Sequence, residues 1–442
     1  MFEDDLRGEV TRGSRALVVY PNIRGQGGQD PDARLEEARG LALAIGIVVA
    51  EAFILPIRQP RAATLFGEGQ VQQIATACEQ NEAELVIVDG SLSAIQQRNL
   101  EEKTGRKVID RTGLILEIFG ERAATAEGRL QVELAHLDYQ AGRLVRSWTH
   151  LERQRGGFGF LGGPGETQIE ADRRMIRDRM ARIRRELEQV RRTRGLHRDR
   201  REKAPWPVVA LVGYTNAGKS TLFNRLTGAD VMAEDLLFAT LDPTMRAVRL
   251  PGVDKAILSD TVGFISDLPT QLVAAFRATL EEVTAADVIV HVRDIANPDS
   301  DQQKKQVIEV LAGLGLFAEE DEGGEPLIPI IEVWNKWDLL SPSRRAELAE
   351  AKAARSDETI VSLSALTGEG CDQLLETVDQ MLTADARVCT FVLPMSDGQR
   401  IAFLHARGEV LSEETLEGES GEPELRIAVR LSERELGRFS AL

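Results

Sequence analysis

The chain has few of the features that mark secreted, disulfide-bonded or membrane-spanning proteins. Its 442 residues include three cysteines, Cys78, Cys371 and Cys389, which lie far apart, so the pattern indicates neither a disulfide framework nor a zinc site. The first residues, MFEDDLRGEV, are acidic and contain no apolar stretch, so we expect no signal peptide. The longest apolar run, residues 41–57, is interrupted by an acidic residue and a proline and is shorter than the ~20 residues of a membrane span. The sequence predicts a soluble cytoplasmic protein with no membrane span.

Positive charge is also scarce overall, since the net charge is −17, and this value alone argues against a nucleic-acid partner. The charge is distributed unevenly, however. Residues 141–203 contain 18 Arg and Lys against 9 Asp and Glu. One segment is therefore basic, and the remainder of the chain is strongly acidic.

The N-terminal region lacks a nucleotide-binding signature, although its pattern indicates an α/β fold. Apolar runs alternate with segments in which apolar residues recur every three or four positions. The predicted strands are 16–20, 47–55, 85–89 and 107–110, and the predicted helices are 32–45, 69–79 and 94–103. This repetition predicts a parallel sheet covered by helices. No G-x-G-x-x-G follows a strand, so whether this region binds a second nucleotide stays open.

Two long heptad patterns follow. Apolar residues from Leu130 to Leu151 step by three and four, and a second seam of this kind runs from Ile169 to Val190. A glycine-rich run, residues 156–165, separates the two seams. Because such a run does not sustain a helix, the pattern predicts an antiparallel helical hairpin with a glycine-rich tip.

The hairpin carries a candidate RNA-binding surface. Arginines on a helix suit phosphate groups, and aromatic side chains at a tip suit stacking on unpaired bases. The candidate RNA-contact residues are Phe158, Phe160, Arg173, Arg174 and Arg177. The alternative is a solvated helix face whose arginines pair with nearby acids such as Glu186 and Glu188.

A phosphate-binding loop is the most specific signal in the chain. GYTNAGKS matches G-x-x-x-x-G-K-[ST], follows the apolar run 207–212 and opens a helical pattern. Backbone N–H groups of such a loop surround phosphates, Lys219 would reach the β and γ phosphates, and Ser220 would offer its hydroxyl to Mg²⁺. The candidate residues of this loop are Gly213, Tyr214, Thr215, Asn216, Ala217, Gly218, Lys219, Ser220 and Thr221.

Three further motifs follow in a fixed order, each at the end of a predicted strand. D-x-x-G would serve Mg²⁺ and the γ-phosphate, N-K-x-D would bind guanine through the carboxylate of Asp338, and a backbone amide in S-A-L would reach guanine O6. These motifs are Asp260, Thr261, Val262 and Gly263; Asn335, Lys336, Trp337 and Asp338; and Ser364, Ala365 and Leu366. An adenine nucleotide would not explain N-K-x-D. The set therefore predicts GTP as the ligand, with GDP as the product.

A loop between the first two motifs supplies a candidate second hydroxyl for Mg²⁺. It consists of Phe238, Ala239, Thr240, Leu241 and Asp242. From the residues alone, Thr240 and Thr244 are both candidates. We expect Lys219, Thr240 and Gly263 to be the residues most directly involved in hydrolysis.

The chain resembles the HflX family of translation-factor-class GTPases along nearly its whole length. The specific matches are GGFGFLGGPGETQIEADRR at 156–174, FATLDPT at 238–244 and DTVGFISDLP at 260–269, although Gly162 stands where the family often has arginine. The resemblance implies binding to the large ribosomal subunit through rRNA and a role in splitting stalled or idle ribosomes. It also supports Ser220 and Thr240 as the Mg²⁺ ligands. We expect a monomer. Alternatives are a GTPase for RNA modification or ribosome assembly, and a protein-docking signalling switch.

Two positions affect the expected hydrolysis. Phe264 stands where Ras-like enzymes place the glutamine that orients the attacking water, so we expect slow intrinsic turnover, on the order of 10⁻⁴ to 10⁻² per second. Asn216 indicates either a K⁺ ion that assists hydrolysis, as in some related GTPases, or simple hydrogen bonding within the loop.

The expected fold class is α/β with four parts. They are an N-terminal α/β domain at 1–125, a basic helical hairpin at 126–204, a P-loop GTPase domain at 205–384 and a small α+β domain at 385–442. In the last part the pattern predicts strands at 388–393, near 409 and at 424–430, and a helix at 396–406. Its role, in packing or in partner contact, stays open.

Overall fold

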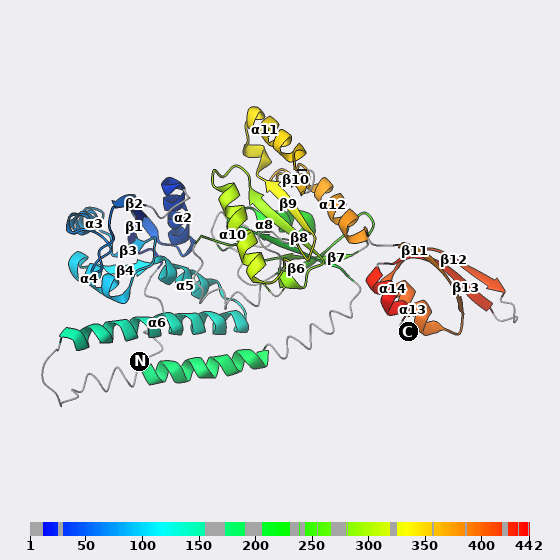
Figure 1. Ribbon diagram of the computed structural model, residues 1–442, viewed down its shortest axis with the longest axis horizontal. Helices are drawn as coiled ribbons and strands as arrows, with labels where there is room; N and C mark the ends of the chain where they lie inside the picture. The colour runs from blue at the N-terminus through cyan, green and yellow to red at the C-terminus, as the bar shows by residue number, and fades with distance from the viewer. Residues whose placement is uncertain are drawn as a thin grey trace.

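The structure is a computed structural model of the 442-residue chain. It describes residues 12–24, 30–154, 173–190, 206–229, 238, 244–253, 255–266, 280, 282–318, 325–355, 358–384, 387–417, 423–431, 433–440 and 442. Figure 1 shows three sheets in a row along the longest axis, with two long helices beside the first.

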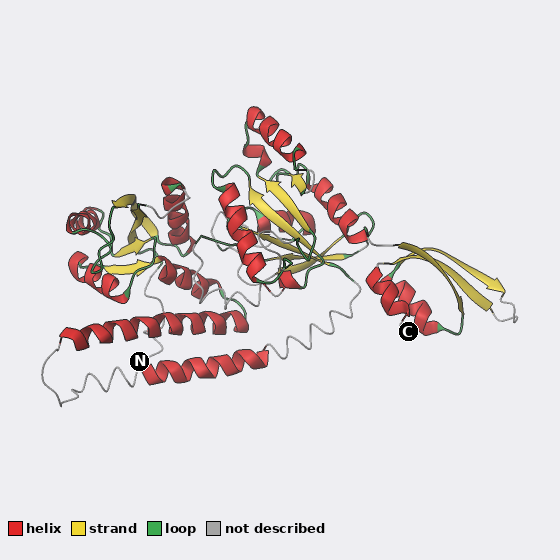
Figure 2. Cartoon of the chain, viewed as in Figure 1, coloured by secondary structure: helices red, strands yellow, loops and turns green. Residues whose placement is uncertain are grey.

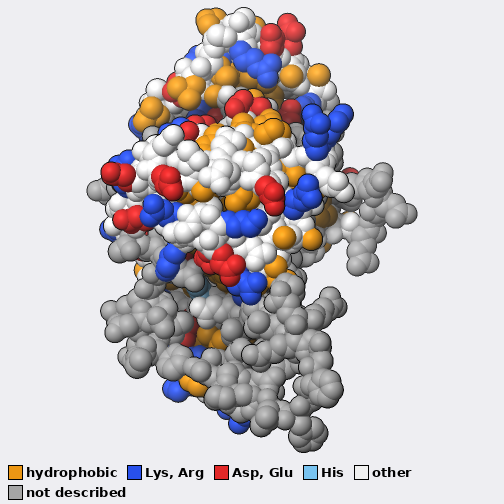
Figure 3. Space-filling model, turned by 90° about the vertical axis from the view of Figure 1, so that its left-hand side faces the viewer, with side chains coloured by type: hydrophobic (Ala, Val, Ile, Leu, Met, Phe, Trp, Pro, Cys, Tyr) orange, Lys and Arg blue, Asp and Glu red, His pale blue; other side chains and the backbone are white. Residues whose placement is uncertain are grey.

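The first sheet is parallel and has the strand order β2-β1-β3-β4. Its strands are β1 (Arg15–Ile23), β2 (Val48–Ile57), β3 (Leu85–Val88) and β4 (Lys107–Asp110), and its helices are α2 (Pro31–Ala44), α3 (Glu68–Gln80), α4 (Ala94–Thr104) and α5 (Arg111–Arg122). We call these elements the N-terminal unit. Every predicted strand and helix is present, and α5 is an additional helix. Figure 3 views this end of the molecule, where acidic, basic and apolar side chains are interspersed among the residues described.

The predicted helical hairpin is present in the described residues. Helix α6 (Ala126–Gln154) lies beside a helix over 173–190 (Figures 1 and 2). Leu137, Met180, Ile183 and Leu187 form a small buried cluster between them, which confirms that the two heptad seams face each other. Arg179 donates to both carboxylate oxygens of Glu133, at 2.7 and 3.0 Å. The hairpin therefore has its own small core and a charged margin.

The central sheet has the order β10-β9-β8-β5-β7-β6, with β6 the antiparallel edge strand. Its strands are β5 (Val208–Gly213), β6 (Thr244–Val248), β7 (Ala256–Asp260), β8 (Val288–Asp294), β9 (Ile330–Asn335) and β10 (Thr359–Ser362), and its helices are α8 (Lys219–Thr227), α10 (Ser300–Gly313), η1 (Trp337–Leu339), α11 (Pro342–Ala353) and α12 (Cys371–Thr383). We call these elements the central unit. The parallel strands all end at one edge, where α/β sheets place their ligand sites.

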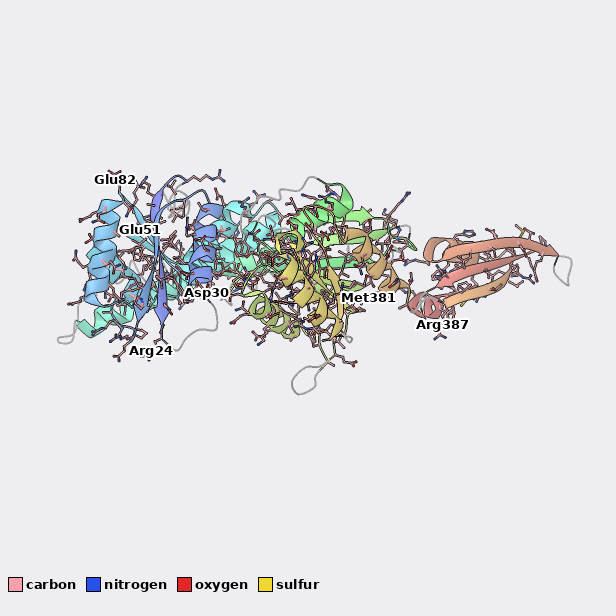
Figure 4. The ribbon with its side chains drawn as sticks, turned by 90° about the horizontal axis from the view of Figure 1, so that it is seen from above. Arg24, Asp30, Glu51, Glu82, Met381 and Arg387 are labelled. Atoms are coloured by element: carbon pink, nitrogen blue, oxygen red, sulfur yellow. The ribbon has the colours of Figure 1, made fainter. Side chains whose placement is uncertain are left out.

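The third sheet is antiparallel, in the order β11-β13-β12. It consists of β11 (Arg387–Pro394), α13 (Gly398–Arg407), β12 (Glu409–Glu417), β13 (Pro423–Leu431) and α14 (Glu433–Ser440). The α+β prediction is confirmed, and α14 is a further helix. Figure 4 labels Met381 on α12 and Arg387 on β11, between which the chain passes to this C-terminal unit.

The buried apolar residues show how these units are held. One cluster contains residues from both the N-terminal and the central unit, including Ile118, Phe119, Tyr214, Phe238 and Phe264. The C-terminal unit instead has a separate cluster around Leu404, Ile427 and Phe439. The first two sheets therefore share a hydrophobic core, and the third has its own.

Candidate functional site

The phosphate-loop motif lies where the central strand β5 passes into α8, as its sequence pattern predicts. Gly218 adopts φ +92°, and a β-carbon there would collide with the side-chain nitrogen of Asn335, so this position requires glycine. Lys219 is buried, and its Nζ donates to the carbonyl oxygens of Gly213 (3.1 Å) and Tyr214 (2.8 Å). Burial lowers the pKa of Lys219 to about 8, so the ammonium is poised for an anionic partner.

Two oxygen ligands suited to Mg²⁺ meet beside this lysine. Ser220 is the second residue of α8 and donates through Oγ to Oδ2 of Asp260, at 2.7 Å. Asp260 is buried at the end of β7. A hydroxyl and a carboxylate at one point are hard donors that fit Mg²⁺, which takes its remaining ligands from phosphates and water. No cluster of three or more His, Cys, Asp or Glu with metal-binding geometry occurs in the described part of the chain.

The D-x-x-G motif is bonded directly to the phosphate loop. The amide of Thr215 donates to the carbonyl of Phe264 at 2.7 Å, and the amide of Phe264 donates to the carbonyl of Gly213 at 3.1 Å. A β-carbon at Gly263 would lie 2.8 Å from Cα of Thr215, so only glycine allows this close approach. The side chain of Phe264 is 4% exposed and is packed in the shared core.

Asn335 joins three motifs through one side chain. Its Nδ2 donates to the carbonyl of Ala217 in the phosphate loop at 2.7 Å, and its Oδ1 accepts from the amide of Ala365 at 2.9 Å. The side chain is buried at the end of β9. The amide of this asparagine thus fixes the loop after β10 against the phosphate loop.

The remaining residues of the guanine motifs lie on the same edge of the sheet. Lys336 adopts φ +63° and pairs with Asp294 at 2.8 Å. Asp338 and Trp337 are half-buried in η1, and Leu366 is 70% exposed. Ser364 is buried and accepts from the amide of Thr367. The predicted base-recognition residues therefore lie together at the ends of β9 and β10.

Some predicted residues lie elsewhere or outside the described residues. Phe238 is buried with φ +58°, and its ring meets Phe119 edge-to-face at 4.8 Å. Arg174 and Arg177 are exposed on the hairpin helix and Arg173 is half-buried, so the three are not part of the nucleotide site. The positions that fall outside the described residues are Phe158, Phe160, Ala239, Thr240, Leu241 and Asp242.

The structure adds one site residue that no motif indicates. Arg225, on α8, donates through Nε to the carbonyl of Ala365 at 3.1 Å, and through Nη2 to the carbonyl of Leu366. These two hydrogen bonds hold the S-A-L loop against α8. The sequence offers no signal for this contact, because it joins α8 to the loop after β10, 140 residues further along the chain.

The fold and the ordered motifs at one sheet edge define a P-loop GTPase, an enzyme that hydrolyses GTP. A protein named GTPase HflX from Magnetococcus marinus is 48% identical over 405 residues, covering 92% of this chain and 89% of that protein. GTPase HflX from Escherichia coli K12 is 44% identical over 391 residues, covering 88% of this chain and 87% of that protein. The chain belongs to the HflX family of GTPases.

Family models match four consecutive parts of the chain. Their descriptions are GTP-binding GTPase N-terminal (residues 32–120), GTP-binding GTPase Middle Region (122–201), 50S ribosome-binding GTPase (208–336) and HflX C-terminal domain (349–440). A crystal structure of a GTP-binding protein from Sulfolobus solfataricus in complex with GDP is 24% identical, covers 84% of this chain and 99% of that one, and has a TM-score of 0.45. Among the described residues, no helix combines the length and apolar character needed to cross a membrane.

Proposed function

We propose that this GTPase is a switch that binds the large ribosomal subunit and helps to split or rescue stalled or idle ribosomes in the cytoplasm. The observation that carries the proposal is the combination of the Asn335-centred GTP site with a separate hairpin that exposes Arg174 and Arg177. The match of residues 208–336 to the model described as 50S ribosome-binding GTPase supports the choice of partner. We further propose that the chain acts as a monomer.

In the proposed site, each motif has one task. Lys219 and the phosphate-loop amides hold the β and γ phosphates, and the amide of Gly263 donates to the γ phosphate. Asp338 accepts from N1–H and the exocyclic amine of guanine, and the amide of Ala365 donates to O6. Asn335 keeps the phosphate and base ends of this site at a fixed separation.

Magnesium fits this site through the hydroxyl of Ser220, and Asp260 would act through water. We retain Thr240 as the proposed second hydroxyl ligand. When bound, the ion neutralises charge on the β and γ phosphates. The protein's own part is to present the Ser220–Asp260 pair already formed, at 2.7 Å.

The buried ring of Phe264 supports slow intrinsic turnover. A phenylalanine side chain directed into the core does not orient water, so the isolated protein should hydrolyse GTP at about 10⁻⁴ to 10⁻² per second. A K⁺ ion near Asn216 stays a secondary proposal, supported by the exposed, left-handed conformation of that residue. Equal hydrolysis rates in potassium and sodium buffers would exclude it.

We also propose that the chain comprises four functional parts, 1–125, 126–204, 205–384 and 385–442. The N-terminal unit, the hairpin, the central unit and the C-terminal unit are the structural basis for this division. The boundary at 384 lies after α12, whose apolar face packs on the central sheet through Leu374 and Val378.

The experiment is GTP turnover by the purified protein alone and with isolated large or small ribosomal subunits. Stimulation by the large subunit alone is the expected result. Stimulation by the small subunit alone would contradict the proposed partner and favour a role in assembly or RNA modification. Absence of stimulation by either subunit would leave the GTPase activity intact and favour the protein-docking switch.

A further inference from the structure

A buried polar cluster connects the N-terminal unit with the nucleotide-binding loops of the central unit. Glu37 on α2, Asp89 after β3 and Arg111 at the start of α5 supply the charges. Tyr214 of the phosphate loop and Ser266, three residues after Gly263, supply the groups from the central unit. Figure 1 shows α5 on the side of the N-terminal unit that faces the central unit.

The guanidinium of Arg111 binds partners from both units at once. Nη1 donates to Asp89 at 2.5 Å, and Nη2 lies 3.2 Å from the carboxylate of Glu37. Nε and Nη2 also donate to the carbonyl oxygen of Ser266, at 3.2 and 3.0 Å. A planar fork of donors is the geometry that only arginine provides.

The charge of Arg111 is balanced within the N-terminal unit. Burial opposes the charge, but Asp89 and Glu37 outweigh this effect and raise the pKa of Arg111. Arg34 pairs with Asp89 at 3.3 Å, so two arginines face two carboxylates. The bonds from Arg111 to the Ser266 carbonyl are therefore not needed for neutralisation. Their effect is to fix a backbone group of the central unit.

The hydroxyl of Tyr214 extends this connection to the phosphate loop. It donates to Glu37 at 3.1 Å and is hydrogen-bonded to Oγ of Ser266. Burial and the nearby Glu37 raise the pKa of Tyr214, so the phenol keeps its proton as a donor. The phosphate loop thus meets Glu37 directly through Tyr214, and Ser266 is connected to the same carboxylate through Arg111 and Tyr214.

The position of Ser266 bears on the reaction through a short run of backbone. Phe264 is hydrogen-bonded on both sides to the phosphate loop, through Thr215 and Gly213. Gly263 precedes it in close contact with Thr215. Fixing the carbonyl of Ser266 therefore limits how far Gly263 moves from the phosphate loop, and with it the amide directed at the γ phosphate.

Helix α5 is well anchored for this task. Its N-cap, Asp110, accepts from the amides of Gly113 (2.8 Å) and Leu92 (3.1 Å) and from the hydroxyl of Tyr139 on α6 (2.7 Å). At the other end of the helix, Phe119 meets Phe238. The start of α5, from which Arg111 extends, is therefore held by Leu92, Gly113 and Tyr139, which all lie outside the central unit.

We propose that Arg111 is a positioning residue for GTP hydrolysis. From the N-terminal unit it holds the segment that follows Gly263 against the phosphate loop, and so sets both the hydrolysis rate and the preference for GTP over GDP. The inference rests on the GTPase activity of the family and is independent of the ribosomal role.

The test compares the full-length variants Arg111→Gln and Arg34→Gln. Arg111→Gln should lower the single-turnover rate by about 10- to 100-fold, as expected for displacement of a reacting group by roughly 1 Å. It should also weaken GTP binding relative to GDP binding. Arg34→Gln removes a positive charge from the same carboxylates, so it controls for loss of stability and should retain turnover within about twofold of the original.

A second pair of variants covers the case in which Arg111→Gln does not fold. Tyr214→Phe removes the hydroxyl that bonds both Glu37 and Ser266 and should lower the rate by at least about fivefold, the factor expected for loss of a single hydrogen bond. Arg111→Lys keeps the positive charge but loses the planar set of guanidinium donors. Its melting temperature should therefore lie closer to that of the original protein than its hydrolysis rate does.

Two results would overturn the proposal. One is a folded Arg111→Gln or Tyr214→Phe protein with unchanged turnover and an unchanged ratio of GTP to GDP affinity. The other is an Arg34→Gln protein with the same loss as Arg111→Gln, because this would assign the effect to stability of the cluster alone.

Discussion

Asp338 is the residue on which selectivity for guanine is expected to depend. It is half-buried in η1 and lies shortly after Asn335, whose side chain accepts a hydrogen bond from the amide of Ala365. Asp338→Asn replaces an acceptor with a mixed amide, so the variant should bind GTP about 10- to 100-fold more weakly and favour xanthosine triphosphate. Fluorescent-nucleotide titration measures both affinities. Unchanged GTP affinity would exclude this assignment.

His291 on β8 should make the folded protein less stable at acidic pH. It is buried, and burial lowers its pKa to about 3; Glu332 raises the pKa, while Arg293, Lys304 and Lys219 lower it further. Because the unfolded chain binds this proton more readily, stability falls as the pH drops below about 6.5. The loss at pH 5 should be about 2 kcal/mol.

The variant His291→Gln isolates this effect from other titrating groups. The free energy of unfolding is measured by denaturant titration between pH 7 and pH 5. The original protein should lose about 2 kcal/mol more than the variant over this range. Equal losses would show that His291 does not titrate on unfolding.

At the scale of single residues, the sequence predicted where the candidate site residues lie because its motifs follow strand ends. Asn335, Asp260 and Lys219 reach one sheet edge for this reason alone. Arg225, Glu37 and Arg111 could not be predicted. Their contacts join segments that are far apart along the chain, and no pattern in the sequence marks such pairs. The contact of Arg111 with Ser266 is one example.

At the scale of elements, the hairpin is the part whose seam can be tested by one substitution. Ile183 is fully buried in the cluster between the two helices, and this cluster is separate from the core of the nucleotide site. Ile183→Ala should destabilise the hairpin by about 2–4 kcal/mol and leave GDP affinity unchanged.

Limited proteolysis of residues 173–190 measures the stability of the hairpin, and GDP titration measures the affinity of the nucleotide site. Arg184→Ala, at the exposed neighbouring position, is the matched control and should resist proteolysis like the original protein. A parallel loss of GDP affinity in Ile183→Ala would show that the hairpin and the nucleotide site unfold together.

Helix α5 shows where element prediction from the sequence was incomplete. The signal was present: Asp110 caps the helix, and Leu114, Ile115, Ile118 and Phe119 recur at helical spacing. The segment follows β4 without a loop, so the strand and helix patterns merge. Helices α2 and α4 of this unit instead begin after Asp30 and Ser93, polar residues that lie outside the preceding strands and so mark a separate start.

At the scale of the whole molecule, charge separation governs the expected mode of binding. The chain has a net charge of −17, so rRNA should be attracted to the arginine-bearing hairpin and repelled elsewhere. At constant Mg²⁺, large-subunit affinity should fall about a thousandfold between 50 and 200 mM salt if about six phosphates are contacted.

Sedimentation of the protein with large subunits at several salt concentrations measures this slope. The double variant Arg174→Gln, Arg177→Gln should reduce the slope of log affinity against log salt by about two. Affinity independent of salt would instead favour docking through the apolar seam.

The arrangement of the units was the least predictable level. Heptad spacing predicted the hairpin, strand and helix patterns predicted the N-terminal and C-terminal units, and the ordered motifs predicted the central unit, because each is a local property of the chain. The packing of the N-terminal unit against the phosphate loop depends on scattered residues such as Phe119 and Tyr214, and no pattern in the sequence marks them as partners of another unit.

The hydrophobic core shared by the first two sheets has a consequence for cooperativity. Since one cluster runs from Ile118 and Phe119 to Phe238 and Phe264, the two units should melt in a single transition, with the C-terminal unit melting in its own. GDP bound to the central unit would then also raise the melting temperature of the N-terminal unit, whose strands it does not contact. Hydrogen exchange of the β3 amides, which lie in the first sheet, would therefore slow when a nucleotide binds at the central sheet.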